Sequence, residues 1–230
     1  MAEQIEFSSN GDEVPGYLVL PPGGTGPGVI VIQEWWGLDS GCKAMAERLA
    51  QGGFVALAPD LYRGQLAGHD EMDKAAELMG ALPADRAARD LSGAVDALAG
   101  HAAVTSEHLG IVGFCMGGML TFLLAANRPD RIKAAVPFYG FPQGDAEPDW
   151  GPMTAVVRGH MAEQDDFFGP DAARALEAKL QSLGNDVTLT VHPGTGHAFM
   201  GPHNALGTFD EALSERLWPE VLAFLHDQLG

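Results

Sequence analysis

Cys115 lies at the centre of residues 111–120, IVGFCMGGML, with Gly113 and Gly117 two positions to either side. An apolar run precedes the cysteine and a helical pattern follows it, so we expect a strand, a sharp turn and a helix. Such a turn strains the residue at its apex, and glycines at this spacing let strand and helix pass closely. The thiol then stands at a helix N-terminus, which favours the thiolate. The Met116 N–H is placed to donate to an oxyanion, so the pattern predicts a nucleophile for acyl transfer.

Two other structures are compatible with a glycine-rich segment that contains a cysteine. Most free cysteines are buried as small hydrophobic residues, which would make Cys115 part of the core. Glycine-rich turns also form nucleotide-binding loops, but this segment has neither the G-x-G-x-x-G spacing nor a Walker lysine. The strand pattern before the turn and the helix pattern after it favour the nucleophile.

A thiol nucleophile requires a base, and the base requires an acid that orients it. Asp165 and Asp166 follow a predicted strand downstream of Cys115, and His197 lies in a glycine-rich loop after the next strand. The order nucleophile, acid, histidine is that of α/β-hydrolases. The local sequence leaves the choice between the adjacent aspartates open. Two further histidines are weaker candidates for the base: His192 and His203.

Alternating strand and helix patterns must position these residues. Predicted strands cover 14–20, 28–33, 54–60, 109–114, 133–140, 153–161 and 186–192. Predicted helices lie near 41–53, 70–80, 84–99, 116–129, 169–184 and 206–229. From residue 28 onward this alternation predicts βαβ units in a mostly parallel, twisted sheet with helices on both faces. With no linker or repeat, residues 1–230 form one predicted α/β domain.

The carboxyl ends of parallel strands form the ligand-binding edge of such a sheet. Ten residues that carry polar, nucleophilic or aromatic groups follow predicted strands at that edge: Glu34, Trp35, Trp36, Asp60, Arg63, Cys115, Tyr139, Asp165, Asp166 and His197. The sequence therefore predicts a single site that contains a nucleophile, an acid and a base.

Composition limits the classes of partner. The chain has 230 residues, of which 46% are hydrophobic, so it can bury a core. Thirteen basic against 31 acidic residues give a formal charge of −18, which argues against nucleic acid and anionic membranes as partners. Two isolated cysteines form neither a disulfide framework nor a metal cluster. The N-terminal residues lack a signal-peptide pattern and no apolar run spans a bilayer, so we expect a cytoplasmic protein.

The chain resembles the dienelactone hydrolase family of α/β-hydrolases over essentially its whole length. The matching motifs are VIVIQEWWG, FVALAPDLYRG, GIVGFCMGG, AEQDDFFGP and GTGHAFM. The resemblance implies an α/β-hydrolase fold with a mostly parallel sheet of about eight strands. It also implies a Cys–His–Asp triad of Cys115, His197 and Asp165, which favours Asp165 over its neighbour.

The motif QEWWG carries further roles that the resemblance implies. Glu34 is expected to pair with the resting thiol and to take part in forming the thiolate, while the Trp35 N–H completes an oxyanion hole with Met116. Other roles are open for these residues. A carboxylate at a strand end can also cap a loop or pair with a lysine, and Trp35 and Trp36 can cover the sheet edge as well as form a pocket wall.

The resemblance is weaker where a substrate would bind. Family members that hydrolyse dienelactone hold its carboxylate with two arginines and a serine. Arg63 is within about one residue of one of these positions, and Ala198 and Gly201 occupy the other two. A clamp built on charge-assisted hydrogen bonds loses much of its strength when half of it is missing. Arg63 is thus either a substrate ligand or a surface residue, and the other expected substrate-binding residues are Trp36 and Tyr139.

These features predict a hydrolase that cleaves an activated carboxylic ester or enol-lactone through a thioester acyl-enzyme. We expect a small-molecule ester or lactone as partner, no metal or organic cofactor, and a monomer, with a dimer left open. Three alternatives remain: a broad carboxylesterase without dienelactone activity, a binding module on a hydrolase scaffold, and a redox protein that uses Cys115. A redox role lacks an evident second thiol, because Cys42 begins an early helix away from the predicted site.

Overall fold

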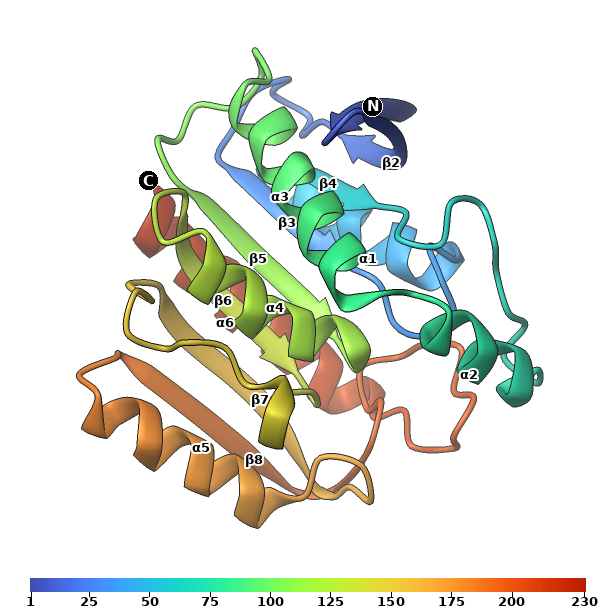
Figure 1. The fold of residues 1–230 in the computed structure, drawn as a ribbon, viewed down its shortest axis with the longest axis vertical. Coiled ribbons are helices and arrows are strands. Elements are labelled where there is room, and N and C mark those ends of the chain that lie inside the picture. Colours follow the sequence, from blue (N-terminus) through green and yellow to red (C-terminus); the bar gives the residue numbers. More distant parts are fainter.

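The computed structural model describes residues 1–230 as one eight-stranded sheet with helices on both faces (Figure 1). The strands are β1 (Ala2–Ser9), β2 (Asp12–Val19), β3 (Gly28–Ile32), β4 (Val55–Pro59), β5 (Leu109–Phe114), β6 (Ile132–Phe138), β7 (Val156–Gln164) and β8 (Val187–Gly196). The helices are α1 (Ser40–Gln51), α2 (Met72–Gly80), α3 (Ala84–Ala99), α4 (Met116–Asn127), α5 (Pro170–Ser182) and α6 (Glu211–Leu229), with a short 3-10 helix η1 (Gly144–Ala146). The mostly parallel α/β fold is confirmed.

The strand order is β1-β2-β4-β3-β5-β6-β7-β8. Strands β1 and β2 run antiparallel to their neighbours, and the six strands from β3 onward pair in parallel. Every residue of β3, β4 and β5 is buried, as expected for continuous apolar strands that are covered on both faces. These three central strands hold the segment around Cys115 rigidly in place.

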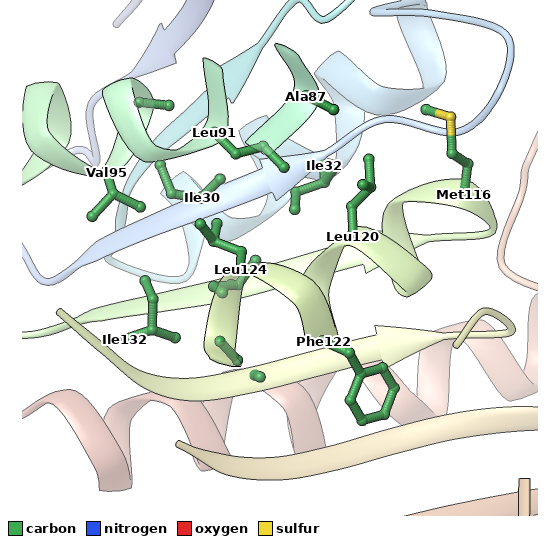
Figure 2. Packing of buried hydrophobic residues seen from close by; sticks show 14 of the residues in the cluster. Ile30, Ile32, Ala87, Leu91, Val95, Met116, Leu120, Phe122, Leu124 and Ile132 are labelled. Carbon is green, nitrogen blue, oxygen red and sulfur yellow. The ribbon is translucent and has the colours of Figure 1, made fainter. Parts of the chain in front are cut away.

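Two hydrophobic clusters divide the helices between the faces of the sheet. Residues of α1 and α6 form the core on one face, and residues of α2, α3, α4 and α5 form the core on the other. Figure 1 shows α3, α4 and α5 in front of the sheet, with α1 and α6 behind it. Figure 2 shows the front core, where Leu91 of α3 and Leu120 and Leu124 of α4 pack near Ile30.

Several elements differ from the sequence prediction, and among them β7 begins and ends three residues later than predicted. Strand β1 was not predicted, because the first three of its residues are exposed and its apolar alternation is short, although it pairs with β2 along its whole length. Strand β8 continues to Gly196, where it pairs with Gln164 of β7. Helix α6 begins at Glu211 instead of near residue 206, because the Asp210 side chain accepts a hydrogen bond from the Leu213 N–H and caps it there.

The carboxyl ends of the parallel strands lie along one edge of the sheet. The chain leaves β3 at Gln33, β5 at Cys115, β6 at Tyr139, β7 at Asp165 and β8 at His197. Segments up to 164 residues apart in the sequence, from Gln33 to His197, therefore meet at this edge. None of the helices has the length and apolarity needed to cross a membrane.

A histidine pair buried between β7 and β8 makes the fold sensitive to acid. Nδ1 of His160 lies 3.1 Å from Nε2 of His192, and the two rings are stacked. Burial, together with the charge of His192, lowers the pKa of His160 to about 3. Because an unfolded histidine titrates near pH 6.5, the unfolded chain binds more protons than the fold below that pH. The contribution of this neutral pair is therefore complete above about pH 6.5 and is lost as the pH falls toward 3.

We predict that His160→Gln reduces the slope with which the free energy of unfolding falls between about pH 6.5 and pH 4. Glutamine keeps a hydrogen-bonding group but cannot take up the proton. Urea unfolding at a series of pH values measures the slope, and His108→Gln at a half-exposed position is the control. An unaltered slope in His160→Gln would show that other groups cause the acid sensitivity.

Candidate active site

Cys115 occupies a strained turn between β5 and α4. Its backbone angles are φ 53° and ψ −118°, a conformation that residues other than glycine rarely adopt. Its amide donates to the Phe138 carbonyl at 3.0 Å, and its own carbonyl accepts from the Gly118 N–H at 2.9 Å. Backbone hydrogen bonds to the neighbouring strand and to the first turn of α4 thus hold the apex in place and direct Sγ away from the sheet.

The turn requires glycine at Gly113 and Gly117. A Cβ at Gly113 would overlap the carbonyl of Gly117, and a Cβ at Gly117 would overlap the carbonyl of Ile32 in β3. Helix α4 therefore starts in direct backbone contact with two strands. The predicted strand, turn and helix are present, with the glycines in the space-making role that their spacing indicated.

His197 and Asp165 form a buried pair. Nδ1 of His197 lies 2.8 Å from Oδ2 of Asp165, and Oδ1 accepts hydrogen bonds from the N–H groups of Phe167 and Phe168 at 2.9 and 3.0 Å. The Asp165 side chain is 0% exposed and that of His197 is 8% exposed. Burial opposes ionisation of Asp165, but His197 and the two N–H donors outweigh it and lower its pKa. Asp166 is exposed and makes no such bond, so the structure places Asp165 as the partner of the histidine.

Glu34 binds two groups, neither of which the sequence connected with it. Its Oε1 accepts from the Tyr139 hydroxyl at 3.1 Å, and its Oε2 lies 3.0 Å from Nε2 of His203. The His203 ring stacks on His69 at 4.0 Å, and His69 in turn binds Oδ2 of Asp39 at 2.7 Å. No local signal joins Glu34 and His203, which are 169 residues apart.

The environment of Cys115 favours the neutral thiol. Burial raises the pKa of the thiol well above its ordinary value, and the charge of Glu34 raises it further. The N–H groups of Met116 and Trp35 act in the opposite direction and favour the thiolate. Both N–H groups therefore lie close to Sγ. Sγ has no hydrogen bond to His197 in this resting arrangement.

An apolar cavity of about 590 Å³ brings these groups together. Sixteen residues line it, eleven of them hydrophobic, and none is lysine or arginine. The lining includes Glu34, Trp35, Trp36, Met72, Met79, Cys115, Met116, Met119, Gln143, Asp166, Phe167, Phe168, His197, Ala198, His203 and Leu206. Trp35 and Trp36 thus form part of a pocket wall. Four methionines contribute flexible, polarisable surface that the sequence motifs did not indicate.

Arg63 does not line this cavity, and its guanidinium is held by groups outside it. Its Nη1 donates to the Glu13 carbonyl at 2.6 Å, and its Nη2 pairs with Oδ2 of Asp90 at 2.9 Å. The Asp90 carboxylate is nearly fully buried, so this ion pair fixes the guanidinium against α3 and the β2 turn. The arginine that resembles a substrate ligand in sequence is a structural cation here.

Tyr139 also lies outside the cavity lining, and its contact with substrate stays a prediction. It is completely buried, and its hydroxyl is committed to Glu34. Its ring packs against His197 with centroids 5.2 Å apart. Tyr139 therefore contacts both Glu34, through its hydroxyl, and His197, through its ring.

Fold and site together define an α/β-hydrolase: a mostly parallel sheet with a strained strand-to-helix turn, followed along the chain by a buried acid and a histidine after the last strand. The family model described as "Dienelactone hydrolase family" matches residues 14–229. The chain belongs to the dienelactone hydrolase family, and the protein is a hydrolase.

Relatives and solved structures agree over nearly the whole chain. "Protein usf" of Aquifex pyrophilus is 37% identical and the alignment covers 100% of both chains. A "Putative carboxymethylenebutenolidase" of Aquifex aeolicus is 36% identical, with 87% of each chain covered. The crystal structure of a "Putative Dienelactone Hydrolase" from Klebsiella pneumoniae superposes with a TM-score of 0.86 at 29% identity, covering 98% of each chain.

The contact between His203 and Glu34 generates a pH prediction. Burial opposes protonation of His203, but the hydrogen bond and charge of Glu34 and the charge of Asp39 outweigh it and raise the pKa. A raised pKa means that the pair stabilises the fold fully below about pH 6.5 and loses this contribution as the pH rises through the folded value. We expect His203→Gln to cost about 1–2 kcal/mol near pH 6 and progressively less toward pH 9. Unfolding titrations of both proteins measure the difference, and a difference independent of pH would exclude a titrating pair.

Proposed function

We propose that the protein hydrolyses neutral, activated carboxylic esters or lactones through a thioester on Cys115. One observation carries the proposal: a buried His197–Asp165 pair opens onto the same cavity as a cysteine at a strained strand-to-helix turn. The three groups have the complementary roles of nucleophile, base and orienting acid. This is also the arrangement that the order of the motifs predicted.

In the acylation step, His197 takes the thiol proton on Nε2, because Nδ1 is engaged by Asp165. The Cys115 sulfur then forms a bond to the carbonyl carbon, and the carbonyl electron pair moves onto oxygen. The N–H groups of Trp35 and Met116 stabilise that oxyanion. Collapse of the intermediate breaks the bond to the leaving oxygen, which takes the proton from His197, and the thioester remains.

In the deacylation step, His197 removes a proton from water, and the resulting hydroxide attacks the thioester carbon. The carbon–sulfur bond breaks, the acid is released, and sulfur regains the proton from His197. A thiolate leaves more easily than an alkoxide, so the first intermediate returns to substrate unless the alcohol is a good leaving group. Enol-lactones and aryl esters meet this condition, and simple alkyl esters meet it less well.

The cavity favours a neutral substrate over the carboxylate-bearing dienelactone. Relatives carry the name carboxymethylenebutenolidase, but this cavity has no lysine or arginine to pair with a carboxylate. Its ionisable groups are two acids, two histidines and the thiol, and the whole chain carries a formal charge of −18. An anion would meet an unfavourable field both on approach and in the site. The broad carboxylesterase is therefore the form of the activity that the site supports best.

The first test follows the acyl-enzyme directly. Native protein incubated with p-nitrophenyl acetate should show a transient mass increase of one acetyl group, and Cys115→Ala should show none. We expect kcat/KM to fall by about 10⁴-fold in Cys115→Ala. Equal rates for both proteins would exclude the cysteine nucleophile. An oxygen adduct without acylation would indicate redox chemistry, and absence of turnover and adduct would indicate a binding protein.

The adjacent aspartates give an internal comparison. Asp165→Asn should lower kcat by about 10³- to 10⁴-fold, because the amide no longer holds His197 in the tautomer that presents a basic Nε2. Asp166→Asn, at the exposed rim, should change kcat by less than about tenfold. Steady-state kinetics on an aryl ester measure both, and a larger loss for Asp166→Asn would reverse the assignment of the acid.

A further inference from the structure

A second apolar cavity adjoins the first between α3 and α4. Its volume is about 370 Å³, and twelve of its fourteen lining residues are hydrophobic. Three residues, Met79, Met116 and Met119, line both cavities. These three methionines therefore lie between the cavity beside Cys115 and a second apolar groove that the mechanism above does not use.

The groove exists because α3 presents small side chains to α4. Ala84, Ala87, Ala88 and Leu91 are spaced along one face of α3 and line one wall. Leu120 and other residues of α4 line the opposite wall. Figure 2 shows Ala87 and Leu91 of α3 across from Leu120 and Met116 of α4. The short side chains of the three alanines leave a channel between α3 and α4.

The position of His197 assigns this groove to one half of an ester. The leaving oxygen must face His197, which follows β8 at one end of the strand order. The groove lies under α3, which packs on β1, β3 and β4 in the opposite half of the sheet. Cys115 and the oxyanion donors stand between the two. A chain in the groove is therefore attached to the acyl side of the carbonyl, and the alcohol points toward His197.

The chemistry of the walls specifies an aliphatic chain. Asp145 is the single charged residue of the lining, and it lies at the exposed end, in η1. The α4 residues that line the groove extend from Met116 to Asn127, about 16 Å of helix at 1.5 Å per residue. The three shared methionines are flexible enough to pass a chain from one cavity to the other.

We propose that the groove between α3 and α4 is an acyl-chain site, and that the substrates are esters of aliphatic acids longer than butyrate. The proposal rests on the proposed function and specifies its substrate class. Each methylene that enters the groove leaves water and should raise kcat/KM by up to about fourfold. A chain that ends in the first cavity gains nothing from the second.

The test uses the full-length protein and p-nitrophenyl acetate, butyrate, octanoate and decanoate, so that the leaving group is constant. We expect kcat/KM to rise by about tenfold or more from butyrate to octanoate. Ala88→Phe, at an exposed position on the groove wall, should lower the octanoate-to-acetate ratio of kcat/KM by about tenfold. Ala84→Phe obstructs the same wall from a second position. The matched control is Ala175→Phe, the same change at an exposed position on α5, which should leave the ratio unaltered.

The outcomes separate this proposal from the proposed function. If Cys115-dependent turnover of acetate is present but neither wall variant alters the ratio, the acyl-chain site is wrong and the thioester mechanism stands. If the wall variants change the dependence on alcohol length, measured with acetates of increasing alkyl chain, the groove holds the alcohol and the assignment is overturned. If acetate turnover does not depend on Cys115, the proposed function itself fails.

Discussion

The close approach of three backbones at Cys115 is the constraint on which the rest of the site depends. Gly117 leaves no space between α4 and the Ile32 carbonyl of β3, while the Cys115 amide is bound to Phe138 at the end of β6. A positive φ at a cysteine costs on the order of 1–3 kcal/mol, so the surrounding structure must over-determine it. Parallel strands on both sides, β3 fully buried and β6 buried except at Lys133, supply that rigidity. Backbone contacts thereby fix the position of Cys115 without any contribution from the side chains that line the cavity.

Around this fixed point, the structure arranges charge so that the thiol stays protonated at rest. Glu34 lies close enough to raise the pKa of Cys115, and it is itself held by Tyr139 and by His203. Opposing N–H groups from Trp35 and Met116 favour an anion at the same place. These N–H groups are therefore largely unused in the resting state. On the proposed mechanism, a carbonyl oxygen that becomes an oxyanion uses them fully, which favours the transition state over the resting enzyme.

The sequence was sufficient for what depends on local pattern and chain order. Buried strands read as continuous apolar runs, and the order Cys115, Asp165, His197 follows from the order of the strands. It was not sufficient where a partner lies far away in the chain. The sequence indicated His203 only as a weak candidate base. Its contact with Glu34 depends on the path of the loop between β8 and α6, which no local pattern predicts. Arg63 resembled a substrate ligand by position, but a buried Asp90 fixes it elsewhere. Strand β1 was not predicted, because most of its side chains face solvent and give no apolar pattern.

On the proposed function, the absence of lysine and arginine from the cavity lining determines how a substrate is oriented. In a site without lysine or arginine, no charge-assisted bond fixes the ester before attack. Orientation must then come from shape and apolar contact, and these act on the parts of the substrate remote from the carbonyl. On the proposed mechanism, a chain held between α3 and α4 would place the carbonyl between Trp35 and Met116 and direct the alcohol toward His197. Apolar contacts far from the reacting atoms would thus align the substrate carbonyl with Sγ. Because the position of Sγ is already fixed, this alignment of the substrate is the main requirement for attack.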